Sequence, residues 1–232
     1  METSLHRELK RLYAGDDART EVRLDGFRID AVCGDELIEI QHGSLAAIRD
    51  KVRRLLAKHR VRIVKPIVAR KTLVKRTAID GREVSRRLSP KRGQLLDIFE
   101  ELVYFTRVFP HRRLTLEVVL VEIEELRHPG HGRRRRWRKD DFVVADQALV
   151  SVGEGLRLAR AADLLQLLPA TLPARFHSGH VAEQLGIQRH IAQRIVYCLR
   201  EMKAIKHVGK QGNTLIYRAG RHKPSRGKDA AA

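Results

Sequence analysis

The chain has 232 residues, and its 47 lysines and arginines against 28 acidic residues give a formal net charge of +19. A hydrophobic content of 43% is typical of a globular protein and argues against a disordered one. The charge lies far outside the usual range of enzymes that act on small neutral substrates. We therefore expect a polyanionic partner, of which nucleic acid is the commonest. The length allows one large or two small domains.

The sequence carries no signal for an oxidising or membrane environment. Its two cysteines, Cys33 and Cys198, fall in an expected strand and an expected helix, so they form neither a disulfide framework nor a zinc-site spacing. No run approaches the roughly 20 apolar residues that span a bilayer, and the N-terminal residues lack the apolar segment of a signal peptide. We expect a cytoplasmic, nucleoid-associated protein without a membrane partner.

The N-terminal residues predict a helix followed by a strand. Ser4 is suited to cap a helix that runs to about Ala14, and Glu8 borders its apolar side. A strand is expected over residues 21–28, with Asp25-Gly26 as a tight turn or bulge. The apolar side of the helix is formed by Leu5, Leu9 and Leu12.

Residues 27–41 have the spacing that points most directly to chemistry. Gly34-Asp35 stands between two β-prone runs and predicts a two-residue hairpin turn of type II′. In that register Cys33 faces Glu36, and Asp30 faces Glu39. Alternation then gives one core face and one site face. The site face holds Arg28, Asp30, Val32, Leu37, Glu39 and Gln41.

Two ionised carboxylates about 5 Å apart destabilise a strand pair unless one is protonated or a cation lies between them. One interpretation is a divalent ion such as Mg²⁺ held by Asp30 and Glu39, with water and a substrate phosphate completing its shell. The alternative is a solvated hairpin in which Arg28 neutralises the acids. A slip by one residue would send the two acids to opposite faces.

The order of these acids resembles the PD-(D/E)xK nuclease superfamily, including its restriction-endonuclease-like and Holliday-junction-resolvase-like members. Glu8, Asp30 and the run Glu39-Ile40-Gln41 match its motif, within residues 4–75. The resemblance implies Mg²⁺, or Mn²⁺, on Asp30 and Glu39, with help from Glu8, which is otherwise an ordinary glutamate of an amphipathic helix. Gln41 stands where the superfamily has a lysine and is expected to orient the attacking water, while Ile29 replaces a proline.

A strand–helix–strand unit is predicted after the hairpin. Ser44 is suited to cap a helix over 45–59, and the β-rich run 61–68 then favours a parallel crossover. Pro66 predicts a strand end or a sheet edge. Lys51 is a candidate for the missing catalytic cation, because some superfamily members supply it from this helix. The alternative is that Lys51 belongs to a phosphate-facing or solvated basic face.

Residues 91–160 are expected to extend the nuclease-like domain of residues 1–90 with a helix over 94–108 and a long β-hairpin over 114–126 and 142–152. One interpretation of the hairpin loop is that it binds phosphates while its aromatic residue stacks on a base. The alternative is a solvated loop. Its DNA-binding candidates are Arg133, Arg134, Arg135, Arg136 and Trp137. The acids expected to balance this loop at the surface are Glu117, Glu122, Glu124 and Glu125.

Residues 161–220 resemble a winged helix-turn-helix. A helix capped by Ser178 is followed by a turn at Gly186, a second helix over 188–203 and two short β-runs. Such modules bind DNA, and some bind proteins. Residues 221–232 are expected to form a disordered basic tail. The expected DNA-binding residues are Arg189, Gln193, Arg194 and Tyr197 on the second helix and Lys206 and Lys210 on the wing.

The predicted architecture is therefore α/β, with a restriction-endonuclease-like mixed sheet flanked by helices and a C-terminal winged-helix domain. Three functions fit it. The first is a Mg²⁺-dependent DNA endonuclease in which Lys51 or Lys65 stabilises phosphate charge. The second is a DNA-binding regulator that keeps the nuclease fold without turnover, which Gln41 favours. The third is an RNA-processing or ribosome-associated protein. We expect DNA rather than RNA as the partner. A homodimer is a further alternative.

Overall fold

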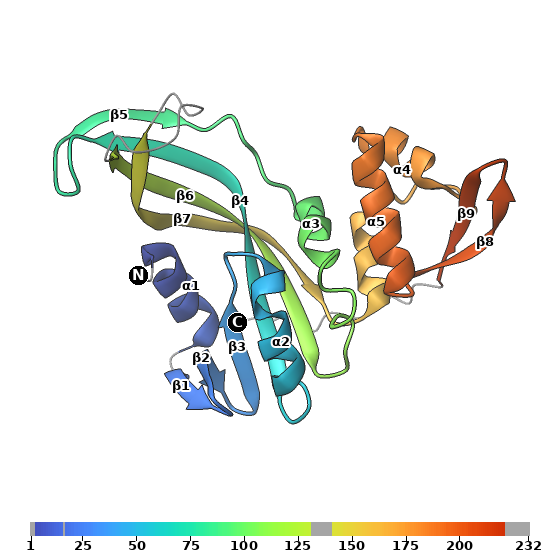
Figure 1. Ribbon diagram of the computed structural model, residues 1–232, viewed down its shortest axis with the longest axis horizontal. Coiled ribbons are helices and arrows are strands. Elements are labelled where there is room, and N and C mark those ends of the chain that lie inside the picture. The colour runs from blue at the N-terminus through green and yellow to red at the C-terminus, as the bar shows by residue number, and fades with distance from the viewer. Residues whose placement is uncertain (1–2, 16, 131–140, 221–232) are drawn as a thin grey trace, which may run out of the picture. The chain divides into compact units, whose positions relative to one another are not determined.

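The computed structural model describes residues 3–15, 17–130 and 141–220 (Figure 1). The chain forms two compact units. One consists of Met1–Glu101 with Arg113–Arg157, and the other of Leu102–Arg112 with Leu158–Ala232. The expected DNA-binding loop with Arg133, Arg134, Arg135, Arg136 and Trp137, and the expected tail 221–232, lie outside the described residues.

The first unit is built on one mixed sheet, which confirms the expected α/β class. Its strands run in the order β1-β2-β3-β4-β6-β7, with β5 beside β4. The pairs β1–β2, β2–β3 and β4–β5 are antiparallel, whereas β3–β4 and β4–β6 are parallel. The parallel crossover expected over residues 36–68 is thus confirmed. The seven strands within the described residues are β1 (Arg19–Leu24), β2 (Phe27–Cys33), β3 (Glu36–Ile40), β4 (Arg60–Arg76), β5 (Glu83–Leu88), β6 (Leu114–Pro129) and β7 (Phe142–Leu158).

Helices α1 (Ser4–Ala14) and α2 (Leu45–Leu55) belong to this unit. Ser44 caps α2 as expected, since its hydroxyl accepts a hydrogen bond from the amide of Ala46. Thr3, rather than Ser4, caps α1, because the Ser4 hydroxyl donates to Asp146 instead. Burying one large apolar side chain contributes roughly 1.5–3 kcal/mol, so the shared core fixes α1 on the sheet. That core contains Leu5, Leu9, Ala14, Ala31, Ile38, Ile40, Val64, Val119, Val121 and Ile123.

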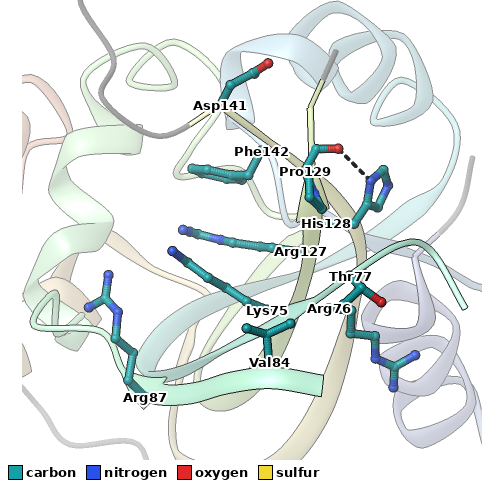
Figure 2. Close-up of a pocket in the computed structure, with 10 residues that line it drawn as sticks. All are labelled: Lys75, Arg76, Thr77, Val84, Arg87, Arg127, His128, Pro129, Asp141 and Phe142. Atoms are coloured by element: carbon teal, nitrogen blue, oxygen red, sulfur yellow. Dashed lines mark hydrogen bonds between the residues drawn. The ribbon is translucent and has the colours of Figure 1, made fainter. Parts of the chain in front are cut away.

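Strand β4 is one strand of 17 residues, longer than the β-rich run 61–68 that the sequence predicted. Pro66 lies within it, two residues beyond Val64, where the pairing with β3 ends. The missing amide of proline therefore faces no β3 partner, which agrees with the sheet-edge prediction. Further along, β5 pairs with β4 over Thr72–Arg76, beside the end of β6 and the start of β7 (Figure 2).

The boundary expected near residue 90 does not divide the sheet, because β6 and β7 continue it. The helix expected over 94–108 is also shorter: a 3₁₀ turn, Leu95–Asp97, leads into α3 (Ile98–Leu102). Residues 103–108, VYFTRV, are rich in β-branched and aromatic residues of low helix propensity and form turns. Phe105 and Phe109 bury their side chains from this segment.

The second unit has a 3₁₀ segment (Ala161–Leu167), α4 (Ser178–Leu185), α5 (Arg189–Glu201) and the antiparallel pair β8 (Ile205–Gln211) and β9 (Thr214–Ala219). Gly186 ends α4 in the left-handed conformation, with φ 62°, as expected for the turn. The N-cap is His177, not Ser178, because the His177 ring nitrogen Nδ1 accepts from the amides of Gly179 and His180. The buried face of α5 is formed by Ala192, Ile195, Val196, Cys198 and Leu199.

Candidate functional site

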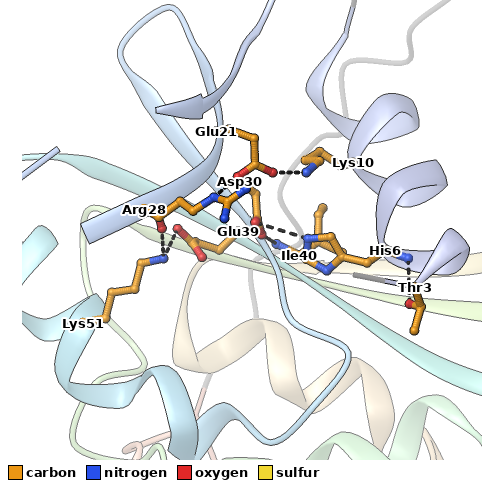
Figure 3. A network of polar contacts seen from close by, with 9 residues as sticks. All are labelled: Thr3, His6, Lys10, Glu21, Arg28, Asp30, Glu39, Ile40 and Lys51. Atoms are coloured by element: carbon orange, nitrogen blue, oxygen red, sulfur yellow. Dashed lines mark hydrogen bonds and ion pairs between the residues drawn. The ribbon is translucent and has the colours of Figure 1, made fainter. Parts of the chain in front are cut away.

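The hairpin of β2 and β3 has the register that the sequence predicted. Cys33 pairs with Glu36, and the pairing continues to Ala31 and Ile38, so the next opposed positions are Asp30 and Glu39. Gly34 begins the turn with φ 57°, a conformation that an L-residue adopts only at a cost. The turn therefore sets the two acids side by side, and Figure 3 shows their side chains in one polar network.

The face that carries the acids is not the open site face that alternation predicted. Val32 and Leu37 on that face are buried, and Glu39 is only 4% exposed. Helix α2 covers this side of the sheet, and its own Val52 and Leu55 are fully buried. Since both faces of the hairpin are covered, the alternative of a solvated hairpin does not hold. Arg28 pairs with Glu21, so it does not neutralise Asp30 and Glu39.

Asp30 is held by groups from two directions. Its Oδ1 lies 3.2 Å from His6 Nε2 on α1, and its Oδ2 accepts a 2.8 Å hydrogen bond from the amide of Ile40. Burial alone would raise the pKa of Asp30, but the hydrogen bonds from His6 and Ile40 outweigh it and lower that pKa. Asp30 is therefore an ionised, oriented carboxylate.

Glu39 behaves in the opposite way. Burial, together with the nearby charge of Asp30, raises the pKa of Glu39 to about 7, although the Lys51 ammonium opposes the rise. Lys51 Nζ lies 2.6 Å from Glu39 Oε1 and also donates to the carbonyl oxygen of Arg28. The pair thus consists of one carboxylate that stays ionised and one that exchanges a proton near neutral pH, with a lysine beside it.

Lys51 and His6 reach this pair, whereas Glu8 and Gln41 are engaged elsewhere. Glu8 Oε2 accepts a 3.2 Å hydrogen bond from the amide of Leu149 in β7. His6 and Glu8 are two residues apart on α1, so they do not face the same way. Gln41 Nε2 donates to the carbonyl of Ser44 at 2.9 Å and holds the turn before α2.

The sequence analysis did not single out His6, although a signal for it existed. His6 directly follows the buried Leu5 and precedes the buried Leu9 by three residues, so it borders the same apolar side of α1 as Glu8. Only the packing of α1 on the sheet decides whether His6 or Glu8 reaches Asp30.

The donors at this site are carboxylate oxygens, the ligand type that hard cations prefer. Among residues 3–15, 17–130 and 141–220 there is no group of three or more His, Cys, Asp or Glu side chains that could hold a metal ion. Two adjacent carboxylates are nevertheless what Mg²⁺ uses when water and substrate phosphate fill its other positions. A buried glutamate with a pKa near 7 also gains a partner when a cation replaces its proton. Asp30 and Glu39 are the residues that would hold it.

The comparisons with known proteins cover both units. A family described as "Domain of unknown function (DUF8091)" matches residues 3–159, which include all seven strands of the sheet. The chain belongs to the DUF8091 family.

A relative from Treponema pallidum (strain Nichols), named "Uncharacterized protein", is 31% identical over 218 residues. The match covers 94% of this chain and 85% of the relative, so it extends well beyond the DUF8091 region into the second unit. No solved structure matches the chain. No helix of the described residues is long and apolar enough to cross a membrane.

Beyond the DUF8091 region, the expected DNA-binding side chains of the second unit lie on two elements. Arg189, Gln193 and Tyr197 are exposed on α5, whereas Arg194 is half-buried. Lys206 and Lys210 are exposed on β8. A hollow of about 280 Å³ between α5 and the hairpin is lined by Arg189, Gln193, Tyr197 and Asn213, among others.

The remaining acids expected at the surface are paired within the DUF8091 sheet. Arg62 pairs with Glu117, Arg70 with Glu122, and Arg86 with Glu124. Glu125 is only 3% exposed and pairs with Lys71 and Arg127, so it is not a surface acid. Within the described chain, basic residues of β4, β5 and β6 neutralise these acids.

Proposed function

We propose that this DUF8091 protein is a Mg²⁺-dependent nuclease that hydrolyses phosphodiester bonds in DNA. The observation that carries the proposal is the approach of Lys51 Nζ to Glu39 at 2.6 Å, beside Asp30, from the helix that follows the hairpin. A lysine next to two acids fills the cationic position that Gln41 leaves empty in the PD-(D/E)xK pattern. In this proposal the mixed sheet has the restriction-endonuclease-like fold.

The residues of the site have separate roles in the proposed reaction. Asp30 and Glu39 hold the cation, which neutralises phosphate charge and lowers the pKa of water when bound. Lys51 keeps a positive charge beside Glu39, and His6 orients Asp30. Hydrolysis joins a water oxygen to phosphorus and breaks one bond from phosphorus to a sugar oxygen, which leaves with a proton from the water.

The second unit has the role of a winged helix-turn-helix in this proposal. Helix, glycine turn, helix and β-hairpin follow one another in that order. The exposed α5 residues Arg189, Gln193 and Tyr197 would read a groove, and Lys206 and Lys210 would contact phosphates. The net charge of +19 supports a nucleic-acid partner for the whole chain.

A second candidate function is DNA binding without turnover. Its supporting observation is that both oxygens of Asp30 already have partners, His6 and the Ile40 amide. In this case Asp30 completes the end of the β2–β3 ladder, and the acid pair stabilises the hairpin rather than a cation.

A cleavage assay separates the two candidates. The wild-type protein is incubated with linear, nicked and branched DNA, with and without Mg²⁺ or Mn²⁺, next to Asp30→Asn, which can still accept the Ile40 hydrogen bond. Metal-dependent products from the wild type that Asp30→Asn does not form support the nuclease. Binding of these DNAs without products under either metal supports the second candidate. Structured RNA as competitor at fixed salt decides whether DNA is preferred.

A further inference from the structure

A basic pocket lies at the far end of the sheet from the acid pair. It has a volume of about 570 Å³, within the usual size of small-ligand sites. Lys75 lies eleven residues along β4 from Val64, which neighbours the acid hairpin, or roughly 36 Å at about 3.3 Å per residue. The pocket is therefore distinct from the Asp30–Glu39 site.

Three cations of neighbouring strands lie on the same face of the sheet here. Lys75 of β4 is the register partner of Arg127 of β6. Arg87 of β5 is the register partner of Leu73, which shares a face with Lys75 because the two are two residues apart. Figure 2 shows Lys75, Arg87 and Arg127 on one side, whereas Arg76 turns away. Like charges at neighbouring positions destabilise a sheet unless an anion compensates them.

Among the described residues, ion pairs compensate only one of these three cations, although Asp141 also lines the pocket. Arg127 pairs with the buried Glu125, its Nε lying 2.7 Å from Glu125 Oε1. Within the described part of the chain, no acidic side chain pairs with Lys75 or Arg87. This contrasts with Arg86, the neighbour of Arg87 on the opposite face of β5, which pairs with both Glu83 and Glu124.

The pocket also has an aromatic wall. The guanidinium carbon of Arg127 lies 3.8 Å from the centre of the Phe142 ring. Stacked guanidinium and aromatic planes are the surfaces on which proteins place unstacked bases, and cations beside them take the phosphate. A concave pocket of this size admits a single base and its phosphate, while a base inside a duplex stays covered by its neighbours.

We infer that the pocket binds a nucleotide unit, with its phosphate on Lys75 and Arg87 and its base against Arg127 and Phe142. The nucleotide is either free or part of a single strand. The inference shares a nucleic-acid ligand with the proposed nuclease but does not depend on hydrolysis.

The test is a binding assay on the full chain in EDTA, where metal-dependent hydrolysis does not occur. The probes are a fluorescent oligothymidylate of about ten nucleotides, the same sequence as a duplex, and adenosine monophosphate. The variants are Lys75→Ala with Arg87→Ala, and Phe142→Leu. Arg86→Ala is the matched control, since it removes one arginine from the adjacent position on the other face of β5. Thermal melting establishes that each variant is folded.

The double variant is expected to bind the single strand at least about tenfold more weakly, with Arg86→Ala close to wild type. The slope of log K against log salt should fall by about 0.7, because the contact with one phosphate is lost. Phe142→Leu should weaken oligothymidylate binding by about fivefold or more. A single strand bound more tightly than adenosine monophosphate identifies a strand as the ligand, and equal affinities identify the free nucleotide.

Two results would overturn the inference. One is a loss of affinity in Arg86→Ala as large as that in the double variant, which would mean that the position of the cations does not matter. The other is a duplex bound more tightly than both other probes, with no effect of Phe142→Leu. Neither result bears on the nuclease, whose failure would appear as binding without cleavage.

Discussion

Two pairs of like charges at opposed strand positions of the sheet, Asp30 with Glu39 and Lys75 with Arg127, are compensated differently. Glu39 is buried and Asp30 is half-buried, and they are contacted by Lys51 and His6, respectively. The cations Lys75 and Arg127 lie at a partly exposed end of the sheet, and among the described residues only Arg127 has an acidic partner. The acid pair adjusts its charge because Glu39 binds a proton near neutral pH.

This difference separates two kinds of ligand. In the proposed nuclease, a small cation replaces the proton of Glu39 beside Asp30. In the proposed nucleotide site, a large anion compensates the charge of Lys75, for which the described residues supply no acidic partner. A substitution that alters one pair should therefore leave the other pair unchanged.

Replacing Lys51 with methionine should lower metal-dependent cleavage by about 10²–10³-fold, because the site loses the charge that stabilises the transferred phosphate. Arg53→Met is the matched control, since Arg53 lies on the same helix and is 62% exposed. It should cleave like wild type. Single-turnover rates on labelled DNA give the comparison. An equal loss of cleavage rate in both variants would show that the total charge of the helix, and not the position of Lys51, determines the rate.

The pH dependence of stability should report Glu39 directly. Its pKa is raised from 4.5 to about 7 in the folded protein, so the folded state binds this proton more tightly than the unfolded chain. The resulting stabilisation is complete below about pH 4.5 and is lost as the pH rises through 7. The free energy of unfolding of wild type should therefore fall by about 3 kcal/mol relative to Glu39→Gln over that range. Denaturant unfolding of both proteins measures it, and parallel curves would refute the assignment.

The turn at Gly34 should matter for the acid pair alone. Gly34 has φ 57°, so Gly34→Ala should cost about 1–2 kcal/mol in the free energy of unfolding. Asp35→Ala, at the other turn residue, should cost less. The nucleotide affinity of the basic pocket should stay the same in both. A turn that tolerates alanine without loss would mean that packing, not the turn, sets the register.

The smallest effect concerns the cation pair. Without ligand, Lys75→Gln removes a repulsion with Arg127, so it should raise the free energy of unfolding by a few tenths of a kcal/mol at low salt. Added salt should remove the difference. A destabilised Lys75→Gln variant would show that Lys75 has a stabilising partner, which would weaken the case for an external anion.

Local sequence signals predicted the parts of the site that local chemistry determines. Gly34-Asp35 fixed the hairpin register, and the spacing after Ser44 placed Lys51 on the helix that follows. The role of His6 could not be predicted, because it depends on how α1 packs on the sheet. The burial of Glu39 and the continuation of the sheet into β6 and β7 also depend on long-range pairing, which alternation within one strand does not reveal. Both pairs of like charges involve strand registers, but only the acid pair has a short turn that specifies its register.

The most direct test of the account is a calorimetric titration of the wild-type protein with Mn²⁺ at several pH values, next to Asp30→Asn and Glu39→Gln. We predict one binding event in wild type that releases a proton and strengthens as the pH rises from 6 to 8, because Glu39 loses its proton near pH 7. Both variants should lose that event. No Mn²⁺ binding in wild type, or equal binding in all three proteins, would contradict the assignment of Asp30 and Glu39 as a cation site.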